Sequence, residues 1–416
     1  MDFAFTEEQQ MIAETVTSFF AENATSERTR KAMAADGFDR ELWSAFSTEL
    51  ALGGVNLPEE HGGAGLGMVE FAIVAEAAGA QVSAIPLLGL AMASQAIAAG
   101  GSAEQKGAWL EALASGATIA VCALDAEVSA DGDTLTGTVS LVAHGGVADV
   151  FVIGNADGGW IVRADADGVA VKVHTTMDQT RPLATVTLSG VQGDPLPDWQ
   201  AAAAAARAAG CICLAAEALG GAQATLDRTV AYAKERVQFG RPIGSFQAYK
   251  HRLADMMIEI EQARSAVYWA ACSLDEDDPE QALALHAAKA FCADTFFRCA
   301  GDMIQLHGRE TPAPGAYSIR ASEEQMARFE QYKRSRFARQ GMLRLMQDTV
   351  GNSTERCAII LVSNDRHQAA LPRPPHSLNP PTGTGSCAAA SAGSSASPGA
   401  SANAKCLCQC QCQYLF

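Results

Sequence analysis

The chain opens with apolar residues that recur every three or four positions, the spacing that gives an α-helix one apolar face. Thr6 and Gln9 have the spacing of a capping box, which marks the start of a helix. The apolar stripe that follows consists of Met11, Ile12, Val16, Phe19 and Phe20. The same period returns over residues 68–80, and Ser102 with Gln105 marks a further helix start. The pattern predicts a helical N-terminal domain.

Short runs of β-branched residues, separated by Gly and Asp, replace this pattern from about Thr118. Runs such as TLTGTVSLV and GVAVKVHT are typical of strands. Pro195 and Pro197 end the last run, because proline cannot donate a hydrogen bond to a sheet. The segment QAAAAAARAAG after them has a high helix propensity. We therefore predict a small antiparallel β domain followed by a second helical domain.

Two long helical patterns meet at the segment RVQFGRPIGSFQ, residues 236–247. The first pattern has the apolar stripe Leu226, Val230 and Ala233. The second is predicted to begin at Ser245, a suitable N-cap. Its stripe consists of Leu253, Met257, Ile260, Ala263, Val267 and Leu274. Gly240, Pro242 and Gly244 break the helix between them, so a tight corner is expected.

With 416 residues the chain exceeds the size at which one core keeps growing, so several domains are expected. The changes of pattern place a helical domain at residues 1–117, the β domain at 118–197 and a second helical domain at 198–350. Residues 351–416 are rich in Pro, Gly, Ser and Ala and poor in large apolar residues, which predicts a disordered tail. A last helix is predicted over residues 322–347.

The net charge of −17 and the pI of about 4.9 argue against nucleic acid or an anionic membrane as the main partner. The sequence has no uninterrupted apolar run of the roughly 18 residues that a membrane span needs. Its N-terminus also lacks the basic and then apolar pattern of a signal peptide. These features predict a cytoplasmic protein without a membrane span.

Cysteines and glycines give no sign of a metal or nucleotide motif. Six cysteines lie in apolar or helical segments, which predicts reduced core residues: Cys122, Cys211, Cys213, Cys272, Cys292 and Cys299. Cys406, Cys408, Cys410 and Cys412 alternate with other residues, whereas thiolate metal sites usually leave two or more residues between ligands, so no metal is predicted. The glycines of EEHGGAGLG follow no strand, so we predict a loop rather than a dinucleotide fingerprint.

The corner between the two long helices has polar groups suited to a phosphate. Arg236 ends one helix and Gln247 lies at the start of the next, so a guanidinium and an amide are presented from rigid ends. A fork of fixed donors suits a pyrophosphate. Alternatively, Arg236 only neutralises a helix C-terminus and Phe239 only fills the core.

The segment YAKERVQFGRPIGSFQAYKHRLADM resembles the C-terminal helical domain of the acyl-CoA dehydrogenase family. FRCAGDMIQLHG, FTEEQQMIAETVTSFF and LPEEHGGAGLG are similar to further segments of that family. The resemblance implies FAD as cofactor, an acyl-CoA substrate, α,β-dehydrogenation in lipid metabolism and a tetramer. It also implies residues that reach across a subunit interface to a neighbour's FAD: Arg236, Phe239, Gln247, Gln305 and Gly308.

Other positions depart from the family. Where members carry Trp-x-Thr beside the flavin, this chain has Leu141 and Ala143, which cannot donate a side-chain hydrogen bond. One family position of the catalytic glutamate falls on Gly210. Glu217 lies two helical turns later on the same face and is a candidate base. The alternative is a surface acid or a buried ion-pair partner. Arg181 is as consistent with a structural role as with a cofactor contact.

The resemblance ends after Gly308. The other family position of the base lies there, so Glu323, Glu324 and Glu330 cannot be matched to it. A shifted reading frame would explain so abrupt a change.

Three hypotheses remain. The chain is a homotetrameric flavin dehydrogenase with an atypical flavin cradle, or an accessory subunit that completes a partner's FAD site in a hetero-oligomer. The third hypothesis is a helical scaffold that keeps the fold without a cofactor.

Overall fold

The computed structural model describes residues 5–176 and 178–307. All of them belong to the first of two units, Met1–Gln340; the second, Gly341–Phe416, lies outside the described residues. The helix predicted at 322–347 and the predicted tail, with the alternating cysteines from Cys406 to Cys412, therefore lie outside the described part as well.

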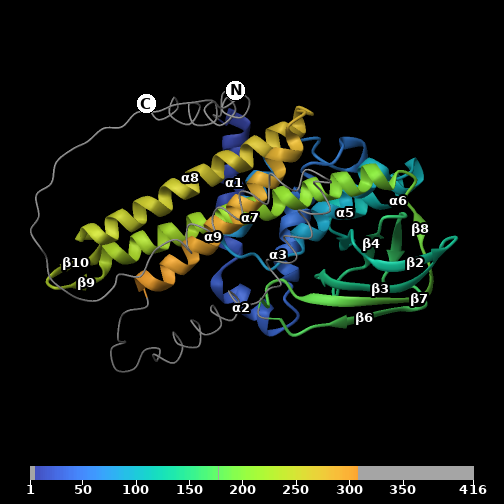
Figure 1. Cartoon of the computed structure of the whole chain (residues 1–416), viewed down its shortest axis with the longest axis horizontal. Coiled ribbons are helices and arrows are strands. Elements are labelled where there is room, and N and C mark those ends of the chain that lie inside the picture. Colours follow the sequence, from blue (N-terminus) through green and yellow to red (C-terminus); the bar gives the residue numbers. More distant parts are fainter. Residues whose placement is uncertain (1–4, 177, 308–416) are drawn as a thin grey trace, which may run out of the picture. The chain divides into compact units, whose positions relative to one another are not determined.

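The first third of the chain is helical, as predicted (Figure 1). Its α-helices are α1 (Glu7–Asn23), α2 (Ser26–Ala34), α3 (Arg40–Ser44), α4 (Met68–Ala80), α5 (Leu87–Gly100) and α6 (Ala103–Ala114). Short turns of other helix types are η1 (Ala45–Glu49), η2 (Leu52–Gly54) and η3 (Glu59–His61). Both predicted capping boxes form, with Thr6 and Gln9 before α1 and Ser102 and Gln105 before α6. Local side-chain chemistry thus sets these helix starts.

Two four-stranded sheets follow, and apolar side chains from both pack into one shared core. The first has the order β1-β4-β5-β8 and the second β2-β3-β7-β6. The strands are β1 (Ala120–Ala123), β2 (Glu127–Asp131), β3 (Thr134–Ala143), β4 (Val150–Gly154), β5 (Gly159–Arg163), β6 (Val169–Val173), β7 (Leu183–Gln192) and β8 (Asp194–Pro195).

The predicted antiparallel β domain is confirmed with one correction, because β1 and β4 run parallel. All other strand pairs of the two sheets are antiparallel. Between β1 and β4 the chain crosses to the second sheet, forms the β2–β3 hairpin there and returns in its original direction. A connection through another layer permits parallel pairing, whereas a tight hairpin does not.

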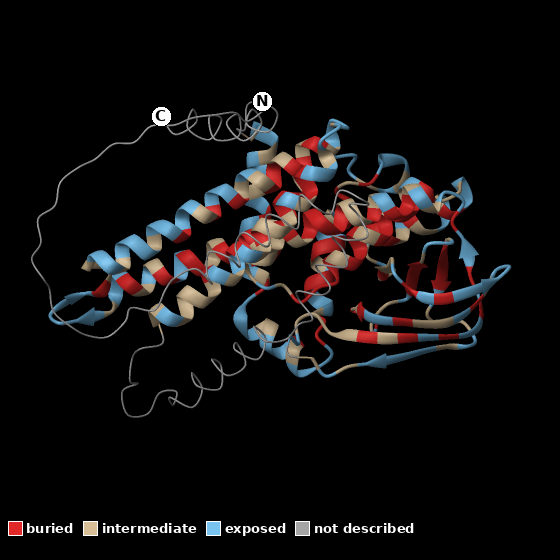
Figure 2. Cartoon of the chain, viewed as in Figure 1, coloured by how far each residue is buried: buried red, intermediate tan, exposed pale blue. Residues whose placement is uncertain are grey.

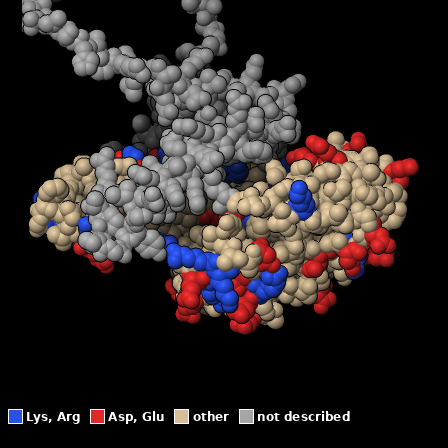
Figure 3. All heavy atoms as spheres, turned by 90° about the horizontal axis from the view of Figure 1, so that it is seen from below, with Lys and Arg blue, Asp and Glu red and all other residues tan. Residues whose placement is uncertain are grey.

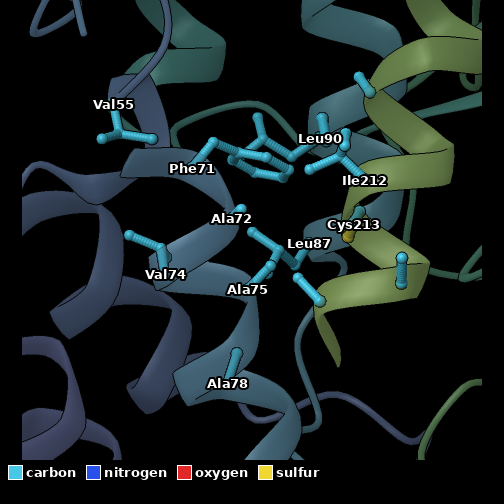
Figure 4. Close-up of a cluster of buried hydrophobic side chains, with 14 of the residues drawn as sticks. Val55, Phe71, Ala72, Val74, Ala75, Ala78, Leu87, Leu90, Ile212 and Cys213 are labelled. Atoms are coloured by element: carbon cyan, nitrogen blue, oxygen red, sulfur yellow. The ribbon is translucent and has the colours of Figure 1, made fainter. Parts of the chain in front are cut away.

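The second helical region begins with α7 (Trp199–Glu235), a helix of 37 residues. It is followed by the hairpin β9 (Val237–Gln238) and β10 (Arg241–Pro242), the turn η4 (Ile243–Ser245), α8 (Gln247–Asp275) and α9 (Gln281–His307). α7 packs against α4, α5, α8 and α9. Figure 4 shows Phe71, Leu87, Leu90, Ile212 and Cys213 meeting where α4, α5 and α7 converge. One core thus joins the N-terminal and C-terminal helices.

Glycines allow α4 and α7 to cross at short range. A Cβ atom at Gly220 would lie 1.9 Å from the carbonyl oxygen of Glu76, and one at Gly79 would lie 2.2 Å from that of Glu217. Both distances are far below van der Waals contact. The crossing therefore depends on the absence of side chains at these two positions.

Two details predicted for α8 are wrong. The helix begins at Gln247 after Phe246, and Ser245 belongs to the preceding turn, so Ser245 is not its N-cap. Met257 is 58% exposed, whereas Met256 is buried. Met256 and not Met257 is thus in phase with the buried Ile260, because the two lie four residues apart.

The glycine-rich loop before α4 is a loop, as predicted, and Asp275 occupies the helix start that follows it. The Asp275 carboxylate accepts hydrogen bonds from the backbone N–H of Met68 (2.7 Å) and of Val69 (3.1 Å). Gly67 leaves room for this contact, because a Cβ atom there would lie 2.6 Å from the carboxylate. A protein carboxylate thus fills the position that an anionic ligand takes at many helix N-termini.

Among the described residues six cysteines are free thiols. Burial raises the pKa of Cys122 and of Cys292 to about 12, so both stay protonated at neutral pH. Residues 5–176 and 178–307 contain no group of His, Cys, Asp or Glu side chains arranged to hold a metal ion.

α7 is the one helix of the described part that is long and apolar enough to cross a membrane. Because 61% of its most apolar window is buried in the protein, core packing accounts for its composition. On the face drawn in Figure 3, Lys and Arg side chains stand next to Asp and Glu side chains. Within the described part, Arg28 forms an ion pair with Asp39 at 2.7 Å.

Candidate active site

A tight hairpin joins α7 to α8 and carries the residues suited to a phosphate. Arg236 is the C-cap of α7, and its N–H donates to the carbonyl of Tyr232 at 2.9 Å. Phe239 and Gly240 form the turn, with φ of 54° and 75°. Two positive φ values are typical of a type I′ turn, which suits glycine but is uncommon for an aromatic residue. The hairpin therefore holds Phe239 in a conformation that costs free energy.

Phe239 is 91% exposed, which contradicts the alternative that it fills the core. Its ring lies 6.2 Å from that of Phe246, measured between centroids. The guanidinium of Arg241 lies 4.1 Å from the centroid of Phe246, a cation–π distance. A strained, exposed aromatic residue is unfavourable in water, so this tip has the composition of a contact surface.

The structure brings Arg236, Phe239, Gln247 and Gln305 to the same end of the helical bundle. Gln247 is the exposed first residue of α8, and Gln305 is exposed in the last turn of α9. The end of α9 is held there because the Tyr249 hydroxyl donates to the carbonyl of Leu306. Figure 2 shows how exposed the hairpin is. Gly308, the fifth predicted residue, lies outside the described residues.

These groups fit a ligand that lies beyond this chain rather than inside it. The side chains of Phe239, Gln247 and Gln305 are exposed, and Arg236 is half-buried beside them. A guanidinium and two amides can donate to the oxygens of a diphosphate, and an exposed aromatic ring can stack on a base. This donor set therefore suits a dinucleotide that lies beyond this chain.

The predicted base Glu217 belongs to a different site, a pocket between α7 and α9. Arg181 donates to Glu217 at 2.6 Å, and both side chains are largely buried. The nearby Glu217 carboxylate raises the pKa of Arg181, so the guanidinium is charged throughout the ordinary pH range. Glu217 is thus an ion-pair partner in this structure. None of the four residues at the bundle end lines this pocket.

The positions that depart from the family offer no donor toward a flavin. Leu141 is 48% exposed and has a φ of 58°, and Ala143 is half-buried. Gly210 faces α5, where a Cβ atom would lie 3.0 Å from the sulfur of Met92. A thioether occupies the space beside Gly210, so a carboxylate does not fit there without a shift of Met92.

Sequence reasoning missed His144, which follows Ala143 and is buried with a φ of 55°. Within the described part neither ring nitrogen has a hydrogen-bond partner of normal geometry, although the Thr180 backbone lies close enough to favour the protonated ring. Burial, and secondarily the charge of Arg181, lowers the pKa of His144 to about 4. The imidazole is therefore neutral at physiological pH. Its place at the end of an apolar strand was the one signal available in the sequence.

Sequence reasoning also missed a polar network between three helices. Glu76 of α4 accepts from Arg264 and, at 2.7 Å, from the Tyr268 hydroxyl, both on α8. Arg264 also donates to Gln223 of α7 at 2.9 Å. The partners lie far apart in the sequence, so no local spacing indicates them. The network fixes α4 and α8 against α7.

Comparison with known families identifies the class of protein. The family model "Acyl-CoA dehydrogenase, N-terminal domain" matches residues 6–117. The family model "Acyl-CoA dehydrogenase, C-terminal domain" matches residues 200–339. The chain therefore belongs to the acyl-CoA dehydrogenase family. A further model, "hTAFII28-like protein conserved region", matches residues 319–364, which lie outside the described residues.

Individual relatives agree with this assignment. The acyl-CoA dehydrogenase IpdE2 of Mycolicibacterium smegmatis is 34% identical over 309 residues, which cover 73% of this chain and 87% of the relative. IpdE2 of Mycobacterium tuberculosis is 38% identical over 304 residues, with 73% and 86% covered. The solved ChsE4-ChsE5 complex from Mycobacterium tuberculosis matches with a TM-score of 0.70 and 29% identity, covering 90% of this chain and 100% of the other.

The family membership confirms the predicted fold, cofactor and reaction class. The chain has the helix, sheet, helix architecture of the family, and FAD is its cofactor. It is a FAD-dependent acyl-CoA dehydrogenase or a subunit of one, an oxidoreductase that acts on CH–CH groups of acyl-CoA thioesters. These findings favour the two flavin hypotheses over the cofactor-free scaffold.

Proposed function

We propose that this chain is the accessory subunit of a heteromeric acyl-CoA dehydrogenase and completes the FAD site of a partner subunit. The observation that carries the proposal is the contrast between two sets of residues. Phe239, Gln247 and Gln305 are exposed at one end of the bundle, and Arg236 is half-buried beside them. The positions that would hold a flavin within the chain have apolar side chains or none.

Arg236 is the central residue of the outward set. It follows the last residue of α7, and the backbone hydrogen bond from Ile243 to its carbonyl (2.8 Å) fixes the hairpin beside it. A positive group on so rigid a support binds a diphosphate without a large loss of side-chain entropy. Gln247 and Gln305 add amide donors, and Phe239 adds an aromatic face. We assign all four residues, together with Gly308, to the partner's cofactor.

The reaction removes a proton next to a thioester carbonyl while a hydride leaves the adjacent carbon. FAD, when bound, would supply the acceptor for this hydride. This chain's part is to hold the dinucleotide in position and to exclude water from the contact. Gly210 cannot accept this proton, so within the described residues the helix position of the base is empty, and we assign the base to the partner.

Solved relatives support a heteromeric assembly. ChsE4-ChsE5 is a complex of two differently named chains. The Tcur3481-Tcur3483 steroid acyl-CoA dehydrogenase variant matches with a TM-score of 0.67 and 28% identity, covering 79% of this chain and 98% of the other. These names motivate a bulky, steroid-derived acyl group as substrate. The domain limits 1–117, 118–197 and 198–350, the tetramer and the cytoplasmic location stay predictions.

The test is to count FAD per polypeptide. The assembly would be purified from the native source through a tag on this chain, and the chain would also be purified alone. We expect FAD in the assembly at fewer than one molecule per polypeptide, and little FAD on the chain alone. If the chain alone bound one FAD per subunit and reduced it with an acyl-CoA, the accessory role would be wrong and the homotetramer hypothesis would hold.

Glu217 is the alternative base, because it lines a pocket and lies on the helix that carries Gly210. If it removes the proton, Glu217→Gln abolishes turnover by the assembly without loss of FAD. We expect instead that E217Q retains turnover and unfolds more easily, because it leaves Arg181 without its ionic partner. Steady-state kinetics and urea unfolding of the same variant distinguish the two roles.

A further inference from the structure

Three basic side chains lie around the hairpin that joins α7 to α8. Lys234 is in the last turn of α7, Arg241 is on β10 and Lys250 is in the first turn of α8. All three are exposed, as is most of the hairpin (Figure 2). We call these three residues the basic collar. The chain between them also contains Arg236 but only one acid, Glu235, so this end of the bundle is positive although the net charge of the chain is −17.

The basic collar has no carboxylate partners of its own. Within the described part none of its three side chains forms an ion pair or a hydrogen bond. Several exposed arginines elsewhere in that part do pair with a nearby carboxylate, for example Arg40 with Asp36 at 2.6 Å and Arg163 with Asp165 at 2.8 Å. The positive charge of the collar is therefore available to an anionic group outside the described part of the chain.

The collar forms the rim of an apolar tip. Val237 is 53% exposed, and Phe239 beside it is held exposed by the turn described above. Phe246 joins this apolar centre to the rim, because its ring lies between the ring of Phe239 and the guanidinium of Arg241 in an edge contact and a cation–π contact. An aromatic centre within a polar rim is the usual composition of a protein–protein interface. The tip is therefore suited to docking on another protein.

We propose that the basic collar docks on an acidic surface of the partner subunit, beside the cofactor site, and that this attraction selects the partner. The inference rests on the proposed function, in that the partner is the subunit that carries FAD. The collar attracts carboxylates over about a Debye length, roughly 10 Å at 0.1 M salt, and needs no contact with FAD. An extended polyanion such as nucleic acid would also meet the acidic remainder of this chain, whereas an acidic patch on a subunit meets only the tip.

Reversal of the three charges tests the collar within the assembly. The tagged chain is expressed in the native source as wild type, as K234E/R241E/K250E and as K234Q/R241Q/K250Q. The measurement is the amount of co-purified partner polypeptide per tagged chain, at NaCl concentrations of about 50 mM and about 500 mM.

The three forms should respond differently to salt. We expect the wild type to retain the partner at low salt and to lose part of it at high salt. The glutamate variant should retain about tenfold less partner at low salt and recover part of it at high salt, because salt screens the repulsion between like charges. The glutamine variant, which has neither attraction nor repulsion, should lie between them and depend little on salt.

R30E/K31E/K172E is the matched control, because it reverses one arginine and two lysines that are also exposed and unpaired within the described residues. It should retain the partner as the wild type does, and urea unfolding of the isolated chains shows that all variants fold. If the glutamate variant kept as much partner as this control, or recovered none at high salt, the inference would be overturned while the proposed function stood. If the wild type co-purified only with copies of itself, both would be wrong.

Discussion

The hairpin end and the middle of the C-terminal helices present polar residues in opposite ways. At the hairpin end, Phe239, Gln247 and Gln305 are exposed and point to a ligand that this chain does not itself enclose. In the pocket between α7 and α9, Arg181 and Glu217 are largely buried and bind each other. Exposure combined with strain indicates a surface completed by another subunit, whereas burial combined with pairing indicates internal structure. A charged residue in a helix can therefore be assigned a role only when its burial and its partners are known.

The strongest test of the comparison is Arg236→Ala in the full assembly. Loss of two charge-assisted hydrogen bonds to a diphosphate should weaken FAD binding about 100-fold, or ~3 kcal/mol. The absorbance of FAD released during gel filtration measures this loss of binding. Arg228→Ala removes a charge from an exposed position on α7 and should leave FAD bound. Unchanged FAD retention by R236A would remove the main support for the outward site.

The buried residue His144 predicts that the stability of the chain depends on pH. Because folding lowers its pKa from 6.5 to about 4, the unfolded chain binds a proton in that interval and the folded chain does not. The free energy of unfolding should therefore fall as the pH drops from 6.5 to 4, by about 3 kcal/mol at most.

Urea unfolding of the isolated chain at several pH values measures this dependence. His144→Asn tolerates the positive φ, cannot titrate in this interval and should flatten the curve. His251→Asn, on the exposed surface of α8, should leave the wild-type curve unchanged. An identical pH dependence in H144N and the wild type would show that other groups cause it.

The close crossing of α4 and α7 gives a smaller effect. Gly220→Ala places a methyl group against the carbonyl of Glu76 and should destabilise the chain by about 1–3 kcal/mol. Gly107→Ala in α6 is the matched control, because no atom lies within 4 Å of its added Cβ. It should stabilise the chain by up to ~1 kcal/mol through helix propensity. Equal effects of the two variants in urea unfolding would contradict the close contact.

The smallest effect on stability is expected at the hairpin tip. Phe239→Asn relieves the positive φ of an exposed aromatic residue and should raise the free energy of unfolding of the isolated chain by about 0.5 kcal/mol. The same variant should weaken assembly with the partner, because an aromatic contact is lost. Urea unfolding and analytical ultracentrifugation measure the two effects. If F239N were less stable than the wild type and still assembled with the partner, the hairpin tip would not be a strained contact surface.

Local patterns predicted a good part of this structure. The capping residues Thr6 and Ser102 set helix starts through contacts three residues away, and such contacts need no tertiary information. The buried face of α8 was harder to predict, because Met256 and Met257 are both apolar. Only packing determines that Met256 is the buried one. The parallel pairing of β1 with β4 also depended on the path of the chain through the second sheet.

The candidate site divides in the same way. The sequence by itself determined the class of protein and the residues of the corner, because Arg236, Phe239 and Gln247 lie within one short segment whose spacing is local. Only the tertiary structure decided that Phe239 projects into solvent and that Glu217 is paired with Arg181. The physical reason is that exposure and pairing depend on contacts between residues far apart in the chain, which no periodicity records.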